Sequence, residues 1–509
     1  TKHILSAPKE KVITDNLDTK SQELYYDDLA LGQVNKVNLT KEDYLVDNVE
    51  VNRDFNDFGL VLTETDPENN VSEIVYDEHN LYPNQIINAL NQTTHTEYNL
   101  LNGQVATSTA ANGAMTVNSF DAFGRLIKTQ VSSPSSTTEL LTKQEIVYQD
   151  FEFPRYKEVK DYFDLNQYKV QREYYDGLDR VIQTKTQTAN ASQWSTQDIS
   201  YDAQGRVVRQ SLPYISQDIS YSSPDLQQVA KSYTYDAQDR VLTESTPVGT
   251  TTYSYDGLTT SIYDAYNHRK DLVKDAHGNL VQVKEYNGQD IYTTNYEYSL
   301  TNKLTKITDA LGNIRNFVYD DLDNLVSQDM IHRPNAQSIP SMTYTYDKNG
   351  NVLSQTNFNN QTITYTYDDL NRVLTESVNG SIKMTYTYDQ GANNVGKLTY
   401  VNYNHNGNWQ SYNYNFLNQL TDYDVRIHGD NYAMNYGYNL NGELKQIDYP
   451  NSKTANYTFN NIGQVAGVSV NSSPVANNLQ YNINGQLVHL ERANGLITDY
   501  SYTPSQAYR

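Results

Sequence analysis

The sequence contains no cysteine, which removes several classes of protein at once. Without thiols, the 509-residue chain forms no disulfide, no thiolate metal site and no cysteine nucleophile. No apolar run approaches the ~18 residues that a membrane helix needs, and residues 1–8 lack the apolar stretch of a signal peptide. Because the chain begins with Thr1 and not with Met, we expect it to be a fragment whose targeting signal is missing.

Positive charge is also scarce. The chain has 38 Lys and Arg residues against 61 Asp and Glu residues, which gives a net charge of −23. Surfaces that bind nucleic acid or anionic membranes need clustered Lys and Arg, so we expect neither partner. With 37% hydrophobic and only 19% charged residues, the composition is that of a folded chain and not of a disordered one.

Helical periodicity is absent, whereas tyrosine is abundant. No sustained i, i+3, i+4, i+7 apolar pattern occurs, but 46 residues are tyrosine, about three times the usual share. The tyrosines mark a repeat: an aromatic residue, Asp or Asn, two variable residues, Gly, Asp or Asn, a polar residue, then Leu or Val. A representative copy is Tyr201-Asp202-Ala203-Gln204-Gly205-Arg206-Val207.

The spacing of these anchor aromatics is regular. Tyr346, Tyr367 and Tyr388 follow one another at 21 residues, and the series that runs from Tyr438 to Tyr502 keeps intervals of 21 or 22 residues. A fixed period in this range is the signature of a repeat architecture. The length therefore does not indicate several separate domains.

Each repeat reads as a β-hairpin. Thr364-Tyr365-Thr366-Tyr367 alternates with period 2, which places tyrosines on one face of a sheet and threonines on the other. The Asp after the anchor bonds backbone N–H groups about two residues on and begins a turn. Gly or Asn four residues after the anchor tolerates a positive φ. We predict an all-β chain in which hairpins of about 21 residues form one continuous spiralling sheet, a hollow shell or part of one.

We divide the repeat array into three parts. Residues 1–131 form a first, more degenerate block, 132–174 an irregular insertion, and 175–509 a regular block. No long linker separates them, so the parts belong to one architecture. The residues that we assign a structural role in the repeat are Tyr175, Asp176, Tyr201, Asp202, Gly205, Arg206, Tyr235, Asp236, Tyr319, Asp320, Tyr346, Asp347, Gly350, Tyr367, Asp368, Tyr388 and Asp389.

No catalytic, metal or cofactor site is expected. The nine histidines are scattered, without His-Glu-x-x-His or another ligand spacing. Acidic residues such as Asp320, Asp321 and Asp323 could ligate Ca²⁺ through oxygen, but we favour the interpretation that they occupy the turn of the repeat. Nucleophile elbows and phosphate-binding loops are absent from the sequence. Tyrosine-lined surfaces also bind sugars and bases, yet tyrosines that occur in every repeat are better explained by sheet packing.

The motif at 201–207, together with Thr308-Asp309-Ala310-Leu311-Gly312-Asn313, resembles the Rhs/YD-repeat family over nearly the whole chain. That family comprises bacterial Rhs polymorphic toxins, the B and C components of insecticidal Tc toxin complexes and, more distantly, the animal teneurins. The resemblance implies a β-sheet strip that spirals into a hollow shell. It also implies a secreted or cell-surface protein that encloses and protects a toxin polypeptide, supplied in cis or by a partner chain, with a co-assembling shell component.

One departure from the family pattern is clear. Rhs proteins with an enclosed toxin end in a core rich in Asp-Pro-x-Gly, whereas Asp66-Pro67 is the only Asp-Pro pair here. We therefore expect the self-cleaving module and the toxin beyond Arg509 or on a partner. The alternative function is a cell-surface adhesion or carbohydrate-binding module, as in the teneurin branch. It requires an exposed aromatic patch at residues 151–156 or at Asn408-Trp409.

Overall fold

The computed structural model describes residues 7–14, 19–31, 33, 36–44, 49–134, 139–334, 339–404 and 407–503. These residues contain strands and turns and no helix, and the strands form one antiparallel sheet of 43 strands. The predicted all-β sheet is therefore confirmed. Each strand pairs with its sequence neighbours, apart from a local exchange in which one strand pairs with the next two.

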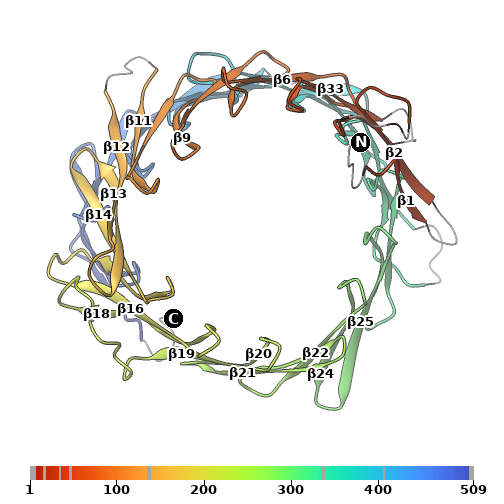
Figure 1. Cartoon of the computed structure of the whole chain (residues 1–509). Coiled ribbons are helices and arrows are strands. Elements are labelled where there is room, and N and C mark those ends of the chain that lie inside the picture. Colours follow the sequence, from red (N-terminus) through yellow and green to blue (C-terminus); the bar gives the residue numbers. More distant parts are fainter. Residues whose placement is uncertain are drawn as a thin grey trace.

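Figure 1 shows that the sheet is a narrow strip wound into a ring. The first circuit of the strip, called the first coil, has these strands: β1 Glu10–Thr14, β2 Thr19–Tyr26, β3 Leu39–Asp43, β4 Glu50–Phe55, β5 Val61–Thr65, β6 Val71–Tyr76, β7 Pro83–Ile87, β8 Thr93–Asn99, β9 Gln104–Thr109, β10 Met115–Phe120, β11 Leu126–Ser132, β12 Leu141–Gln149, β13 Arg155–Asp164, β14 Gln167–Tyr175, β15 Val181–Gln187, β16 Trp194–Tyr201, β17 Val207–Ser211, β18 Tyr214–Ser216, β19 Ala230–Tyr235, β20 Val241–Thr246, β21 Gly249–Asp256, β22 Thr259–Tyr263, β23 Arg269–Lys274, β24 Leu280–Asn287 and β25 Asp290–Tyr298.

The strip then passes its own start and continues as a second coil, which overlaps the first in the view of Figure 1. The strands of the second coil are β26 Leu304–Thr308, β27 Ile314–Tyr319, β28 Leu325–Asp329, β29 Ser341–Tyr346, β30 Val352–Thr356, β31 Thr362–Tyr367, β32 Val373–Val378, β33 Ser381–Tyr388, β34 Leu398–Tyr403, β35 Asn408–Tyr414, β36 Leu420–Ile427, β37 Asp430–Tyr438, β38 Leu444–Tyr449, β39 Lys453–Phe459, β40 Val465–Val470, β41 Ser473–Tyr481, β42 Leu487–Arg492 and β43 Ile497–Asp499.

A β-bulge recurs where each anchor aromatic ends its strand. In the β31–β32 pair, Thr366 faces Thr375, but the next residue, Tyr367, faces Val373, so Leu374 is the extra residue. The same shift precedes Tyr201 and Tyr346. A bulge bends the strand and increases its twist. Repeated in nearly every hairpin, it gives a single-layer strip the curvature to wind into a ring.

The strip has two edges, which we name by their turns. The anchor edge carries the turns that follow the anchor aromatics, such as 202–206 and 347–351. The return edge carries the turns at the other ends of the hairpins, such as 66–70 and 110–114. Because β12, β13 and β14 pair in the sheet like their neighbours, residues 132–174 interrupt the 21-residue rhythm without interrupting the strip. The division into three blocks stays a prediction.

Candidate functional site

The turn after each anchor aromatic is held by its Asp side chain. Asp202 Oδ1 accepts hydrogen bonds from the backbone N–H groups of Gln204 (3.0 Å) and Arg206 (2.9 Å). The backbone closes the same turn, since Gly205 N–H donates to the Asp202 carbonyl. Gly205 has a φ of +89°, a conformation that L side chains rarely adopt. The sequence motif Asp-x-x-Gly is therefore explained by this turn: the Asp side chain accepts its N–H groups, and the Gly adopts its positive φ.

A charge pair completes the turn where Arg is the fourth residue after Asp. Arg206 Nε donates to Asp202 Oδ2 at 2.7 Å. Partial desolvation raises the pKa of Asp202, but the bonds from the backbone and guanidinium of Arg206 outweigh it, so the pKa lies below its ordinary value of 3.8. The pKa values of Asp176 and Asp236 are lowered in the same way by Arg180 and Arg240. Asn324 and Asn351 replace this Arg beside Asp320 and Asp347.

The anchor hydroxyls tie each repeat to the one before it. Tyr367 OH donates to the carbonyl of Val352 at 2.7 Å. Val352 is the first residue of the strand that follows the preceding turn. The other anchors that make this bond, each with its acceptor, are Tyr201 with Val181, Tyr235 with Val207, Tyr255 with Val241, Tyr298 with Leu280, Tyr346 with Leu325, Tyr388 with Val373 and Tyr481 with Val465.

The turn arginine of one repeat also covers the anchor ring of the next. The Arg180 guanidinium lies 4.6 Å from the ring centre of Tyr201, and Arg372 lies 4.3 Å from that of Tyr388. This cation–π contact stacks neighbouring turns along the anchor edge. Burial raises the pKa of both tyrosines, so their hydroxyls remain protonated donors at neutral pH.

Two of the repeat residues that we predicted from the sequence, Tyr175 and Asp389, make different contacts from those of the other anchors and turns. The hydroxyl of Tyr175 donates to Glu173 Oε2 at 2.6 Å and not to a backbone carbonyl; burial and this bond raise its pKa. Asp389 begins a longer turn, in which its N–H donates to the Lys397 carbonyl and its Oδ1 accepts from Gly396 N–H at 2.6 Å.

The other face of the strip carries hydroxyl pairs. In β29, Thr343 and Thr345 are exposed, whereas Tyr344 and Tyr346 are half-buried. Thr345 Oγ1 lies 2.7 Å from Ser354 Oγ, and Thr366 Oγ1 lies 2.7 Å from Thr375 Oγ1. The predicted separation of tyrosine and threonine faces therefore holds in this strand.

The two coils meet along a seam between the return edge of the first and the anchor edge of the second. Asn349 Nδ2 donates to Asp66 Oδ2 at 2.7 Å, and Lys348 N–H donates to Glu68 Oε1 at 2.8 Å. Further along, Asn112 Nδ2 donates to the Phe416 carbonyl. The partners are about 280 to 304 residues apart in sequence, which is the length of one circuit.

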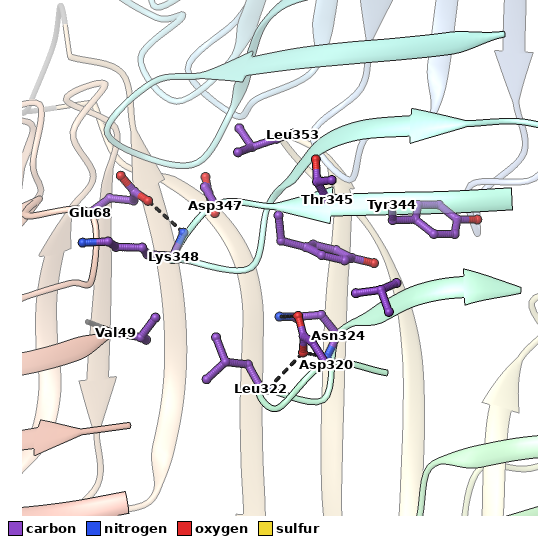
Figure 2. A pocket seen from close by; sticks show the side chains of 12 residues that line it. Val49, Glu68, Asp320, Leu322, Asn324, Tyr344, Thr345, Asp347, Lys348 and Leu353 are labelled. Carbon is purple, nitrogen blue, oxygen red and sulfur yellow. Dashed lines mark hydrogen bonds between the residues drawn. The ribbon is translucent and has the colours of Figure 1, made fainter. Parts of the chain in front are cut away.

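A cavity of about 520 Å³ opens at this seam. Figure 2 shows Val49 and Glu68 of the first coil facing Leu322, Asp347 and Lys348 of the second. A second seam cavity, of about 670 Å³, lies beside Phe163, whose carbonyl accepts the N–H of Leu440. Mixed apolar and polar walls of this kind suit packing between coils.

A buried polar cluster lies under the loop 217–229, on the outside of the ring near β18 (Figure 1). Lys185, 1% exposed, donates to the Asp218 carbonyl at 2.9 Å, and Gln183 Nε2 donates to Asp198 Oδ1 at 2.7 Å. Burial lowers the pKa of Lys185. This cluster was not predicted from the sequence, because nothing in the repeat pattern marks the strand residues that the loop covers.

The acidic residues and histidines of the described part of the chain form no metal cluster. In the part of the chain that the structure describes, no group of three His, Cys, Asp or Glu side chains could hold a metal ion. The carboxylate of Asp320 accepts the N–H groups of Leu322 and Asn324, so it serves the turn. Among the same residues there is no helix long and apolar enough to cross a membrane.

The geometry defines a β-repeat strip wound into stacked coils, and comparison with known proteins agrees. Residues 346–382 match the family described as RHS Repeat. This match confirms the resemblance to the Rhs/YD-repeat family: the chain carries Rhs repeats. No curated protein matches the sequence.

Several solved structures share the fold. The crystal structure of TcdB2-TccC3 superposes with a TM-score of 0.83 at 14% identity, over 98% of this chain and 32% of that chain. TcdB2-TccC3 without its hypervariable C-terminal region gives 0.82 at 14% identity, over 97% and 34%. A variant Tc holotoxin pore of Photorhabdus luminescens gives 0.81 at 14% identity, over 96% and 33%. The chain has the Tc toxin shell fold and spans about a third of the length of these chains.

Proposed function

We propose that this chain is a stretch of the wall of a shell that encloses and protects a toxin polypeptide in a bacterial Rhs or Tc-like toxin system. The observation that carries the proposal is the seam. A strip that only curved would leave a gap after each circuit, whereas here the return edge of one coil is hydrogen-bonded to the anchor edge of the next. The wall acts by confinement and not by catalysis.

The chemistry of the wall suits a polypeptide cargo. In strands such as β29, one face of the strip presents threonine hydroxyls and the other presents tyrosine rings. Unfolded polypeptide binds weakly to such a surface, because its exposed amides find partners and its apolar side chains find little area. The similar fold of the TcdB2-TccC3 structures and of the Tc holotoxin pore supports this placement, as well as a secreted location and a co-assembling shell partner.

Limited proteolysis of the complete gene product, purified with any partner chain, tests the proposal. We expect a non-repeat polypeptide to survive a protease concentration that digests the same polypeptide once the shell is denatured, and mass spectrometry identifies it. If every non-repeat segment is digested at the rate of the denatured sample, the chain does not enclose a cargo.

The adhesion alternative rests on exposed aromatics, and one of its two candidate sites is not exposed. Trp409 is half-buried, and its ring stacks on that of Tyr400 with centres 5.9 Å apart. Phe151 and Phe153 are exposed, but they lie in the β12–β13 turn of the anchor edge. Loss of binding on a glycan array after Trp409→Ala would favour the alternative.

A further inference from the structure

The face of the strip that carries the anchor tyrosines lines the inside of the ring. The loop 217–229 lies on the outside of the ring (Figure 1) and covers Asp198, whose Oδ2 atom accepts the Asp225 N–H at 3.1 Å. Asp198 is fully buried beneath this loop. In the same strand, the side chain of Tyr201 points to the opposite face, because successive side chains of a strand alternate.

Strand pairing carries this inner face from hairpin to hairpin. Tyr365 and Met384 both pair with Glu376, so the three side chains share one face. Tyr386 lies two residues after Met384 and therefore on the same face. The position two residues before each anchor is thus part of the inner wall, as the anchor itself is.

An unbroken row of aromatic side chains occupies this position from β25 onward. Every second strand from β25 to β39 has an aromatic residue two before its anchor: Phe317 in β27, and tyrosine in each of the others, from Tyr296 to Tyr457. We call these residues the aromatic row, and all of them are half-buried. From β4 to β16 the same position is never aromatic, and it holds residues such as Asn118 and Glu173. Because both stretches form the same strip, the sheet does not require aromatic residues here.

The hydroxyls of the aromatic row differ from those of the anchors. Tyr367 and Tyr388 donate to backbone carbonyls of the preceding repeat. The hydroxyls of Tyr296, Tyr365 and Tyr457 make no hydrogen bond with any residue that the structure describes. A half-buried tyrosine of this kind offers a ligand both an apolar ring and a hydrogen-bonding group.

The spacing of the aromatic row matches an extended polypeptide. Neighbouring members lie two strands apart, which is ~10 Å. An extended chain advances ~3.3 Å per residue, so every third residue of such a chain would reach a ring. The strands between the rings present apolar or amide side chains on the same face, such as Ile307, Gln328 and Gln355. These groups suit the main chain and the apolar side chains of many sequences.

We propose that the aromatic row is a track that holds the enclosed polypeptide in an extended conformation along the inner wall. The proposal rests on the proposed function and deepens it, because it names the surface that the cargo contacts. Each ring supplies a weak contact, and several such contacts on one chain hold it by multivalency. The cargo is thus kept extended without being trapped at one strong site.

Photocross-linking in the complete gene product, purified with any partner chain, tests the proposal. Benzoyl-phenylalanine replaces Tyr365 or Tyr436 in the aromatic row. The matched controls carry it at Thr366, which is exposed on the outer face of β31, and at Asn118, on the inner face of the first coil. We expect the row positions to form adducts with a non-repeat polypeptide at a yield severalfold above that of both controls. Adducts with sugar and no peptide, or equal yields at Tyr365 and Asn118, overturn the proposal.

Removal of neighbouring rings is the second measurement. Tyr344→Ser with Tyr386→Ser should lower the yield at position 365 severalfold, whereas Thr345→Ser with Thr387→Ser, on the outer face, should leave it unchanged. An unchanged yield in the first double variant also overturns the proposal, and equal thermal unfolding midpoints establish that the variants fold. Protease protection of the cargo is measured separately. A protected polypeptide that is not cross-linked to the row refutes the track alone, whereas cross-links to an unprotected polypeptide refute the enclosing shell alone.

Discussion

The hydroxyl of Tyr367 donates a hydrogen bond of 2.7 Å to the carbonyl of Val352, and this bond links two consecutive repeats. In repeat proteins, stability is the sum of terms within each repeat and terms between neighbours. The Tyr–carbonyl bond belongs to the second kind. It explains why the anchor is tyrosine at most positions and not phenylalanine, although both supply the same ring.

Tyr367→Phe should therefore weaken the coupling between two repeats by about 1 kcal/mol, the usual net value of one hydrogen bond. Amide hydrogen exchange in β30 and β31 should accelerate accordingly. Tyr432→Phe is the control, because the exposed Tyr432 hydroxyl makes no hydrogen bond with the described residues. Equal exchange in both variants would mean that the ring alone couples the repeats.

Asp202→Ala should open its turn. It removes the acceptor for the N–H groups of Gln204 and Arg206 and the partner of the Arg206 guanidinium. We expect a larger loss of stability than from one neutral hydrogen bond, since hydrogen bonds to charged groups contribute more than neutral ones. Asp202→Asn should cost less than half as much, because it keeps the Oδ1 acceptor, as Asn460 does in its own turn. Urea denaturation measures both.

Stability should fall in acid. The pKa values of Asp176, Asp202 and Asp236 are lowered in the folded state, so these carboxylates stabilise the fold above their unfolded pKa, and the contribution is lost as pH falls through the folded value. The urea midpoint should therefore decrease from roughly pH 5 downwards. Replacing all three by Asn should flatten this part of the profile, whereas an unchanged slope would assign acid sensitivity to other carboxylates.

Lys185→Met should release the loop 217–229. The substitution keeps the length of the side chain but removes the charged donor of the Asp218 carbonyl, which then accepts only from Ser216 Oγ. Loss of a hydrogen bond from a charged donor costs about 1.5–3 kcal/mol, so the Ser222 amide should exchange faster and proteases should cut the loop. Lys270→Met, at an exposed ion pair with Glu285, should change neither readout.

Glu68→Ala should weaken the contact between the two coils locally. Glu68 Oε1 is the acceptor for the Lys348 amide, 280 residues away. Exchange of that amide should accelerate severalfold, by the ~1 kcal/mol of one exposed hydrogen bond, while the β29–β30 strands stay protected. Glu68→Gln retains an acceptor and should leave the exchange rate close to that of the unsubstituted chain. Acceleration in both variants would show that charge, and not the hydrogen bond, holds the seam.

Local structure followed closely from the sequence because its causes are local. Period-2 alternation, the Asp turn and the positive φ at Gly205 each depend on residues within one hairpin. The bulge before Tyr367 was not predicted, because it depends on the pairing of two strands. The cluster around Lys185 and Asp198 was missed for the same reason: its burial is caused by a distant loop and has no signature in the repeat.

By itself, the sequence determined the repeat, the strand and turn in its regular units, and the face that the tyrosines occupy in an alternating strand such as β29, since backbone sterics and side-chain hydrogen bonds act over a few residues. Only the tertiary structure decided which edges meet. Curvature accumulates over some 280 residues before Glu68 reaches Lys348, and a small change of twist in each hairpin would displace that meeting point. The same accumulation buries Ile462 and leaves Phe123 exposed, although the two occupy the same position in their turns.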